Sequence, residues 1–96
     1  MTASSSQTPA DHAASLASSG EANGHGMNAL KQGAFDAAIA YFGRACALDP
    51  EAGPLWRNLA TAYRNKGDDA GERTALDHAL DCDRTDFMAW QRKAEL

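Results

Sequence analysis

The chain has no basic residue near its N-terminus and no long apolar run. The first Lys or Arg is Lys31. A secretory signal needs a charged start and an apolar stretch, and a transit peptide needs arginines, so residues 1–20 fit neither class. A typical apolar run is Ala37–Phe42, whereas a membrane helix needs about 20 apolar residues. We therefore expect a cytoplasmic protein with no membrane contact.

Cysteine and positive charge are also scarce. Two cysteines, Cys46 and Cys82, cannot form a disulfide framework, and without an export signal we expect both to be reduced. The formal net charge of -4 argues against a nucleic-acid partner, which would require a basic surface for phosphates. At 96 residues, the chain is long enough for at most one small domain.

Catalytic and metal-binding patterns are weak. His78 and Cys82 lie four apart, but two ligands do not make a zinc site. His12 falls in a polar segment, and His25 falls at a core position of an expected helix. The glycines of residues 20–26 lack the strand and the lysine of a phosphate-binding loop. We expect no metal, no cofactor and no catalytic residues in this segment.

The first part of the chain differs in composition from the rest. Residues 1–20 are rich in Ser, Ala and Thr, contain Pro9 and Gly20, and have almost no large apolar side chain. Such a segment buries too little surface to offset the entropy lost on ordering, so we expect a disordered tail. Its alanines favour at most a transient helix around Asp11–Ala17.

From about Ala22 onward, apolar residues recur at spacings of three and four, which is typical of amphipathic helices. Gly33 interrupts this pattern and Asp49-Pro50 ends it. The same helix start and stop signals recur further along the chain, with Pro54 at a helix start and Gly67 at a helix break. The predicted helices cover Ala22–Gln32, Phe35–Leu48, Pro54 to about Lys66 and Asp68–Cys82, and a fifth begins around Thr85-Asp86.

Equivalent residues return at one spacing. Trp56 and Trp90 lie 34 residues apart, and so do Gly33 and Gly67. Two further pairs with this separation are Phe42 with Leu76 and Ala45 with Ala79. A fixed period of this length indicates an internal repeat of two antiparallel helices.

These residues resemble the tetratricopeptide repeat, whose 34-residue signature is W-x2-L-G-x2-Y…A-x3-F…P. The second unit carries its first half, and the first unit carries its second half; the matching residues are Trp56, Leu59, Ala60 and Tyr63, and Ala38, Phe42, Ala45 and Pro50. The resemblance implies an all-α fold of antiparallel helix-turn-helix repeats, an α-solenoid of about five helices. Its units would be 21–52, 53–86 and a partial third at 87–96.

Some positions depart from the family pattern. Ala22, His25 and Ala29 replace large residues in the first unit, so we expect a loosely packed or frayed first helix. Glu72 stands where a small residue normally lets two helices approach, and Arg84 stands where Pro normally ends a unit. These two substitutions bear on the tightness of the second hairpin.

In this family, ligands bind the concave groove lined by the first helix of each unit. Carrying the groove positions over gives a basic, amide-rich set: Asn23, Met27, Leu30, Lys31, Arg57, Asn58, Thr61, Arg64, Asn65, Met88, Gln91, Arg92 and Glu95. Seven acids fall on or beside the second helices, which form the outer face of such repeats: Asp36, Asp68, Asp69, Glu72, Asp77, Asp81 and Asp83. Arg and Asn side chains suit a protein or peptide partner with acidic groups. The alternative is an ordinary solvated helix face.

Other readings of the function remain open. The lysines of the chaperone-binding clamp found in family co-chaperones are missing, since Asn23 and Met88 stand at those positions. We expect the chain to be the N-terminal piece of a longer protein. It is similar to repeats preceding the dioxygenase domain of bacterial aspartyl/asparaginyl β-hydroxylase-like proteins. The alternative function is therefore an N-terminal accessory repeat segment of such an enzyme, with a downstream domain of the same chain as the partner. Self-association through the third unit is a further alternative.

Overall fold

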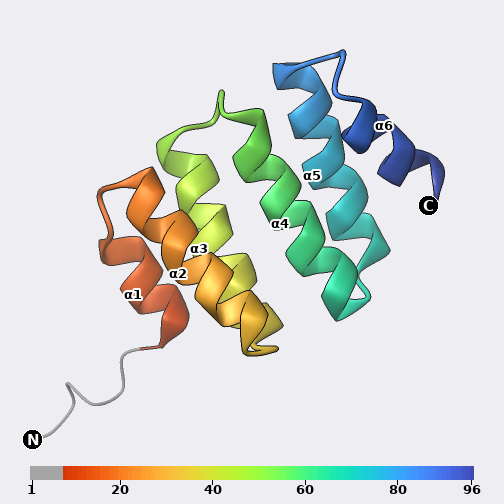
Figure 1. The fold of residues 1–96 in the computed structure, drawn as a ribbon. Coiled ribbons are helices and arrows are strands. Elements are labelled where there is room, and N and C mark those ends of the chain that lie inside the picture. The colour runs from red at the N-terminus through yellow and green to blue at the C-terminus, as the bar shows by residue number, and fades with distance from the viewer. Residues whose placement is uncertain (1–7) are drawn as a thin grey trace, which may run out of the picture.

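The computed structural model describes residues 8–96 (Figure 1), so positions 1–7 of the expected tail lie outside the described residues. Six helices and no strand are found in that described part. The helices are α1 (Pro9–Ser15), α2 (Ser19–Lys31), α3 (Phe35–Leu48), α4 (Gly53–Lys66), α5 (Asp69–Cys82) and α6 (Phe87–Ala94). The expected all-α helical-repeat fold is therefore confirmed.

The helices form two antiparallel hairpins, α2–α3 and α4–α5, which pack side by side through α3 and α4 (Figure 1). α1 packs on α3 at one end of the row, and α6 packs on α5 at the other. Helices α3, α4 and α5 each bury several residues in the core. Phe42 of α3 and Leu76 of α5, the residues one repeat apart, are both fully buried.

Both hairpins turn on a glycine in the left-handed region, where a Cβ would be strained. Gly33 has φ 76° and Gly67 has φ 88°. The backbone bonds around them are also equivalent. The N–H of Ala34 donates to the carbonyl of Ala29 and the N–H of Asp68 to that of Tyr63, each at 2.9 Å. The two turns therefore repeat in geometry as well as in sequence.

The two tryptophans occupy equivalent positions. The indole Nε1 of Trp56 donates to the carbonyl oxygen of Pro50 at 2.9 Å, and that of Trp90 donates to Arg84 at 2.8 Å. Pro50 and Arg84 are themselves one repeat apart. Arg84 supplies the same backbone acceptor as the proline, so this departure from the family signature does not disturb the helix junction.

Small residues permit the close helix contacts. Ala45, Ala60 and Ala79 are fully buried. At Gly71, an added Cβ would lie 2.5 Å from Cδ1 of Tyr63, so this glycine lets α5 approach α4. The bulky Glu72 beside it does not separate the hairpin, because Gly71 carries the close contact.

The segment 8–20 differs from the expected tail. Thr8 caps α1 by accepting from the N–H of Asp11 at 3.1 Å, and Ala13 and Leu16 are buried. Arg44 of α3 donates from Nε to the carbonyl of Leu16 at 2.9 Å. A second long-range hydrogen bond joins His12 to Tyr41. Two buried apolar groups, a cap and two long-range hydrogen bonds are thus enough to order a segment with little apolar surface.

The first repeat helix also differs from its expectation. α2 is continuous from Ser19, and Ser18 caps it by accepting from the N–H of Glu21 at 3.2 Å. Ala22 and Gly26 are buried against the neighbouring helices. The expected fraying is wrong because small residues here bring α2 closer to α3 instead of loosening it. None of the helices among residues 8–96 is long and apolar enough to cross a membrane.

Candidate functional site

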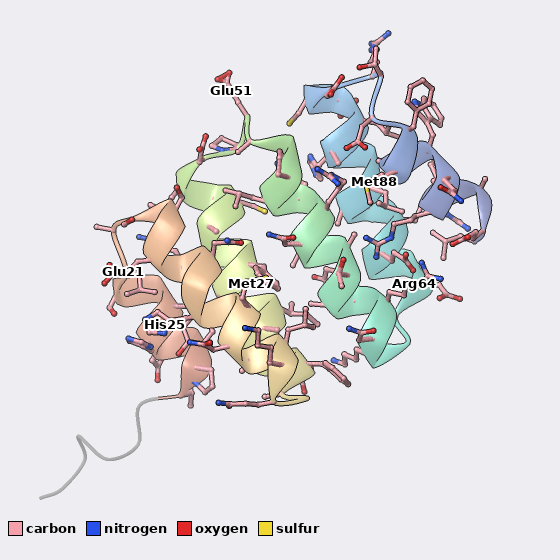
Figure 2. All side chains as sticks on the ribbon, viewed as in Figure 1. Glu21, His25, Met27, Glu51, Arg64 and Met88 are labelled. Atoms are coloured by element: carbon pink, nitrogen blue, oxygen red, sulfur yellow. The ribbon has the colours of Figure 1, made fainter. Side chains whose placement is uncertain are left out.

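We call the surface formed by α2, α4 and α6 the first-helix face. The residues predicted to line the groove lie on these helices or at their ends, but Leu30 is half-buried and packs against the core. Figure 2 shows Met27, Arg64 and Met88 on this side of the molecule, one from each helix. Asn58 of α4 donates from Nδ2 to Oδ1 of Asn23 on α2 at 2.8 Å, so the two expected amide residues meet directly. Both are half-buried.

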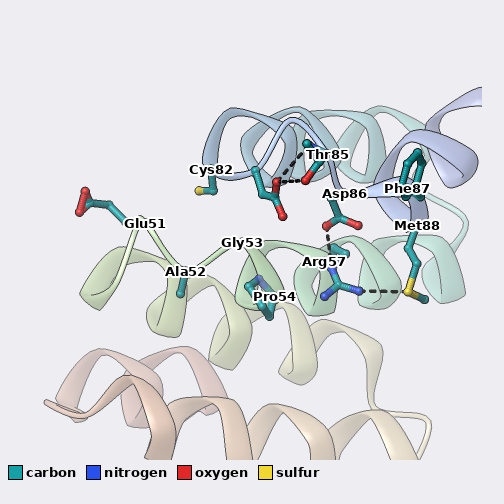
Figure 3. A pocket seen from close by; sticks show the side chains of 11 residues that line it. Glu51, Ala52, Gly53, Pro54, Arg57, Cys82, Thr85, Asp86, Phe87 and Met88 are labelled. Carbon is teal, nitrogen blue, oxygen red and sulfur yellow. Dashed lines mark hydrogen bonds and ion pairs between the residues drawn. The ribbon is translucent and has the colours of Figure 1, made fainter.

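Arg57 is held between two groups at the start of α6 (Figure 3). Its Nε lies 2.9 Å from Oδ2 of Asp86, the residue that caps α6. Its Nη1 donates to Sδ of Met88 at 3.4 Å. These side chains, together with Glu51 and Phe87, line a hollow of about 500 Å³ beside the start of α4. The guanidinium of Arg57 is therefore already neutralised.

Arg92 of α6 makes a second polar contact across the first-helix face. Its Nη1 donates to Oγ1 of Thr61 on α4 at 2.9 Å. Its Nη2 lies 3.7 Å from Oε2 of Glu72 on α5, a carboxylate with only 3% of its side chain exposed. Glu72 was expected on the outer surface; it instead lies inside, because Arg92 supplies a countercharge for a buried carboxylate.

The other charged groups of the first-helix face are more exposed. Arg64 lies 3.3 Å from Glu95, and about half of each side chain is exposed. Lys31 is exposed and has no ion pair with any residue from 8 to 96. Asn65 and Gln91 are exposed and uncharged.

The charge of the first-helix face therefore differs from the sequence expectation. Each of its three arginines contacts a carboxylate, and two of those acids, Glu72 and Asp86, were not expected on this face. Lys31 also lies on this face, and it forms no ion pair with a carboxylate among residues 8–96. The surface carries several amides but is far less basic than a count of its arginines indicates.

Cys46 is buried, whereas Cys82 lines the hollow beside Arg57. Burial raises the pKa of the Cys46 thiol to about 12. Burial also raises the pKa of Cys82, helped by the negative charge of Asp81. His78 stacks on Trp56 with ring centroids 4.1 Å apart, so it packs against an aromatic ring. Within residues 8–96, no group of three or more His, Cys, Asp or Glu side chains could hold a metal ion.

One cluster was missed by sequence reasoning. Nδ1 of His12 on α1 lies 2.6 Å from Oη of Tyr41 on α3. His25 of α2 stacks on the same tyrosine with centroids 5.2 Å apart. The cluster joins three helices on the side of α2 remote from α4. Two histidines without a third ligand do not form a metal site, so we assign it a packing role.

The comparison with known families agrees with this architecture. The family model described as "Tetratricopeptide repeat" matches residues 29–96, well over half of the chain. The chain therefore belongs to the tetratricopeptide repeat family. No curated protein matches it, and the similarity to β-hydroxylase-like proteins stays a prediction. Tetratricopeptide repeats mediate protein–protein interactions and are typically non-catalytic.

Proposed function

We propose that the first-helix face binds an extended segment of a partner protein, so that the chain acts as an interaction module. The observation that carries this proposal is the contact between Asn23 and Asn58, at 2.8 Å. It places two amide groups side by side across α2 and α4. Each amide has donor and acceptor capacity beyond that one bond, and can therefore bond the backbone of a ligand.

The surroundings of these amides suit a peptide. Met27 is 38% exposed and Met88 is 59% exposed, and they flank the amide pair from α2 and α6. Methionine is flexible and polarizable, so it adapts to varied apolar side chains. The hydroxyl of Thr61 on α4 already donates to the carbonyl of Arg57 and accepts from Arg92, so the amides are the polar groups available to a ligand here. This mixture of amides and thioethers supports binding of a segment with both polar backbone and apolar side chains.

The charges favour a ligand with few acidic groups. Arg57 and Arg92 are held by Asp86 and Glu72, so an incoming carboxylate would have to displace an acid already present. Lys31 is exposed, and the contact of Arg64 with Glu95 is exposed and open to exchange. The proposed segment therefore carries one or two acidic side chains near Lys31 and Arg64. A uniformly acidic peptide is a poorer fit.

The experiment is selection of ligands from a library of random dodecapeptides displayed on phage, followed by titration of the selected synthetic peptides. Asn58→Ala should weaken binding about 5- to 10-fold, the effect of one lost hydrogen bond in an interface. The matched control is Asn28→Ala. Asn28 is an exposed residue of α2 lying near Gln32 and Tyr41, away from α4, and its loss should change affinity less than about twofold.

Chemical-shift mapping locates the bound peptide independently of the variants. Shifts concentrated on Asn23, Met27 and Asn58 support the proposal. Shifts concentrated on α1 or on the outer surface of α5 would contradict it, and so would equal effects of Asn58→Ala and Asn28→Ala. Failure of every library peptide to bind would also count against a peptide-binding role.

A further inference from the structure

Ion pairs are concentrated on one helix. Five are found between residues 8–96, and four of them join α6 and its two capping residues to α4 or α5. Asp86 contacts Arg57 and Glu95 contacts Arg64. Arg92 contacts Glu72, and Nζ of Lys93 lies 2.6 Å from Oδ1 of Asp77. The fifth, Lys66 with Asp36, joins α4 to α3.

Apolar burial on α6 is small by comparison. Ala89 is its buried residue. Its large apolar side chains face outward, with Phe87 83% exposed, Met88 59% and Trp90 49%. The sequence equivalent of Trp90 behaves differently, because Trp56 stacks on His78 of the next helix and is half-buried. The contact of α6 with the rest of the fold thus contains many charges and little apolar area.

We infer that α6 is an electrostatically latched helix: ion pairs hold it on the α4–α5 hairpin, and it detaches as a unit at high ionic strength while α2–α5 stay folded. The α2–α3 and α4–α5 hairpins are held instead by buried side chains such as Phe42 and Leu76. Salt does not weaken apolar burial, so the two kinds of contact respond in different ways.

Screening explains the expected response. The Debye length is about 10 Å at 0.1 M salt and about 3 Å at 1 M, so exposed pairs lose most of their attraction at the higher value. The pairs Arg64–Glu95 and Lys93–Asp77 are of this kind, with at least a third of each side chain exposed. The Glu72–Arg92 pair is more buried and less screened, so the fraction of molecules with α6 detached should rise gradually with salt concentration.

Detachment of α6 would also change the first-helix face, a consequence that rests on the proposed function. α6 contributes Met88, Gln91 and Arg92 to that surface. When it leaves, only the α2 and α4 portions remain, including the Asn23–Asn58 contact. The affinity for the partner should then fall more steeply with salt concentration than screening of the Lys31 charge alone would explain. The latch itself is measured without any ligand.

The test is amide hydrogen exchange of the full chain, read by residue with NMR in about 0.05 M and about 1 M NaCl. The backbone N–H groups of Trp90 and Glu95, bonded to Asp86 and Gln91, report on α6. We expect their protection to fall about fivefold or more in high salt, with α3 and α4 unchanged. Unchanged protection of α6, or equal loss in all helices, overturns the inference.

Variants separate the latch from a general salt effect. Asp86→Asn keeps a good helix cap but removes the charge facing Arg57, and Lys93→Gln removes the pair with Asp77. The double variant should show low α6 protection already at low salt. The matched control Lys66→Gln removes the α4–α3 pair, and its α6 protection should equal that of the wild type. If the control loosens α6 as much as the double variant, the latch is refuted.

Discussion

Gly26 of α2 lies directly against the ring of Phe42 of α3. A Cβ added at Gly26 would lie 2.6 Å from both Cδ1 and Cε1 of that ring, far closer than van der Waals contact. Phe42 is fully buried, so it has little room to move away. This one contact fixes how closely the two helices of the first hairpin approach each other.

Replacement of Gly26 by Ala should therefore destabilise the fold. Overpacking typically costs about 1–3 kcal/mol, and the better helix propensity of Ala returns up to about 1 kcal/mol. We expect a net loss of about 1–2 kcal/mol in the free energy of unfolding, measured by urea denaturation. Gly24 is the control, because nothing lies within 4 Å of its added Cβ. Gly24→Ala should stabilise the protein, and a change of the same sign at both sites would contradict this reading.

Removal of Arg92 should be costly because Glu72 would be left buried without its countercharge. We expect Arg92→Ala to lower the free energy of unfolding by about 2–3 kcal/mol. The double variant Glu72→Ala with Arg92→Ala should lose less than the sum of the two single variants. Lys93→Ala breaks an exposed pair and should cost less than about 1 kcal/mol. Strict additivity would show that the Glu72–Arg92 contact contributes nothing.

The two cysteines should react at very different rates. Cys46 is 1% exposed, and burial raises the pKa of its thiol to about 12. Cys82 is exposed. Iodoacetamide at about pH 8 should modify Cys82 in the folded chain and Cys46 only after unfolding in urea, as followed by mass spectrometry. Equal modification of both thiols in the native protein would contradict the burial of Cys46.

The same pKa shift gives a pH dependence. The unfolded chain releases the Cys46 proton near the ordinary value of 9.0, whereas the folded chain keeps it until about 12. The contribution is fully present below pH 9.0 and is lost as the pH rises toward 12, so the free energy of unfolding falls in that range. Cys46→Ala lacks this contribution and should show a shallower fall. Parallel curves for the two proteins would exclude it.

The ordering of α1 can be tested at Leu16, which is 8% exposed and closes that helix against α3. Leu16→Ala should cost about 1–2 kcal/mol, less than a central core site, because α1 can detach while the hairpins remain folded. The N–H of His12, bonded to Thr8, should be protected from exchange in the wild type and unprotected in the variant. Rapid exchange at His12 in the wild type would restore the expectation of a disordered tail.

The repeat helices were predictable because their bounds depend on local signals. Gly33 and Gly67 stop helices in the sequence and adopt positive φ in the structure. Pro54 lies in the first turn of α4, as the sequence predicts. The 34-residue spacing of Trp56 and Trp90 predicted equivalent positions in the repeat, and both indoles donate to equivalent carbonyls. The prediction from composition was wrong for α1. This helix is ordered because Leu16 packs against residues that lie far along the chain, such as Ala45 and Leu55.

The site was less predictable because charge pairing depends on packing. The sequence predicted that Arg57, Arg64 and Arg92 share one surface, and they lie on α4 and α6 in the structure. The sequence could not show that Asp86 reaches Arg57, since the whole of α5 separates the two residues along the chain. Nor could it show that Glu72 points inward, because a Glu on a helix is ordinarily solvent-exposed. The sequence therefore indicated which amide residues lie on the first-helix face, but it could not predict the net charge of that face.

The identical glycine turns have a practical consequence for protein engineering. Each hairpin reverses direction with the same backbone geometry at Gly33 and Gly67, and each is joined to the following helix through equivalent carbonyls at Pro50 and Arg84. Residues 53–86 therefore form a cassette with matching ends. A second copy could be spliced in after position 86 without designing a new linker, and this would lengthen the row of helices by one whole module.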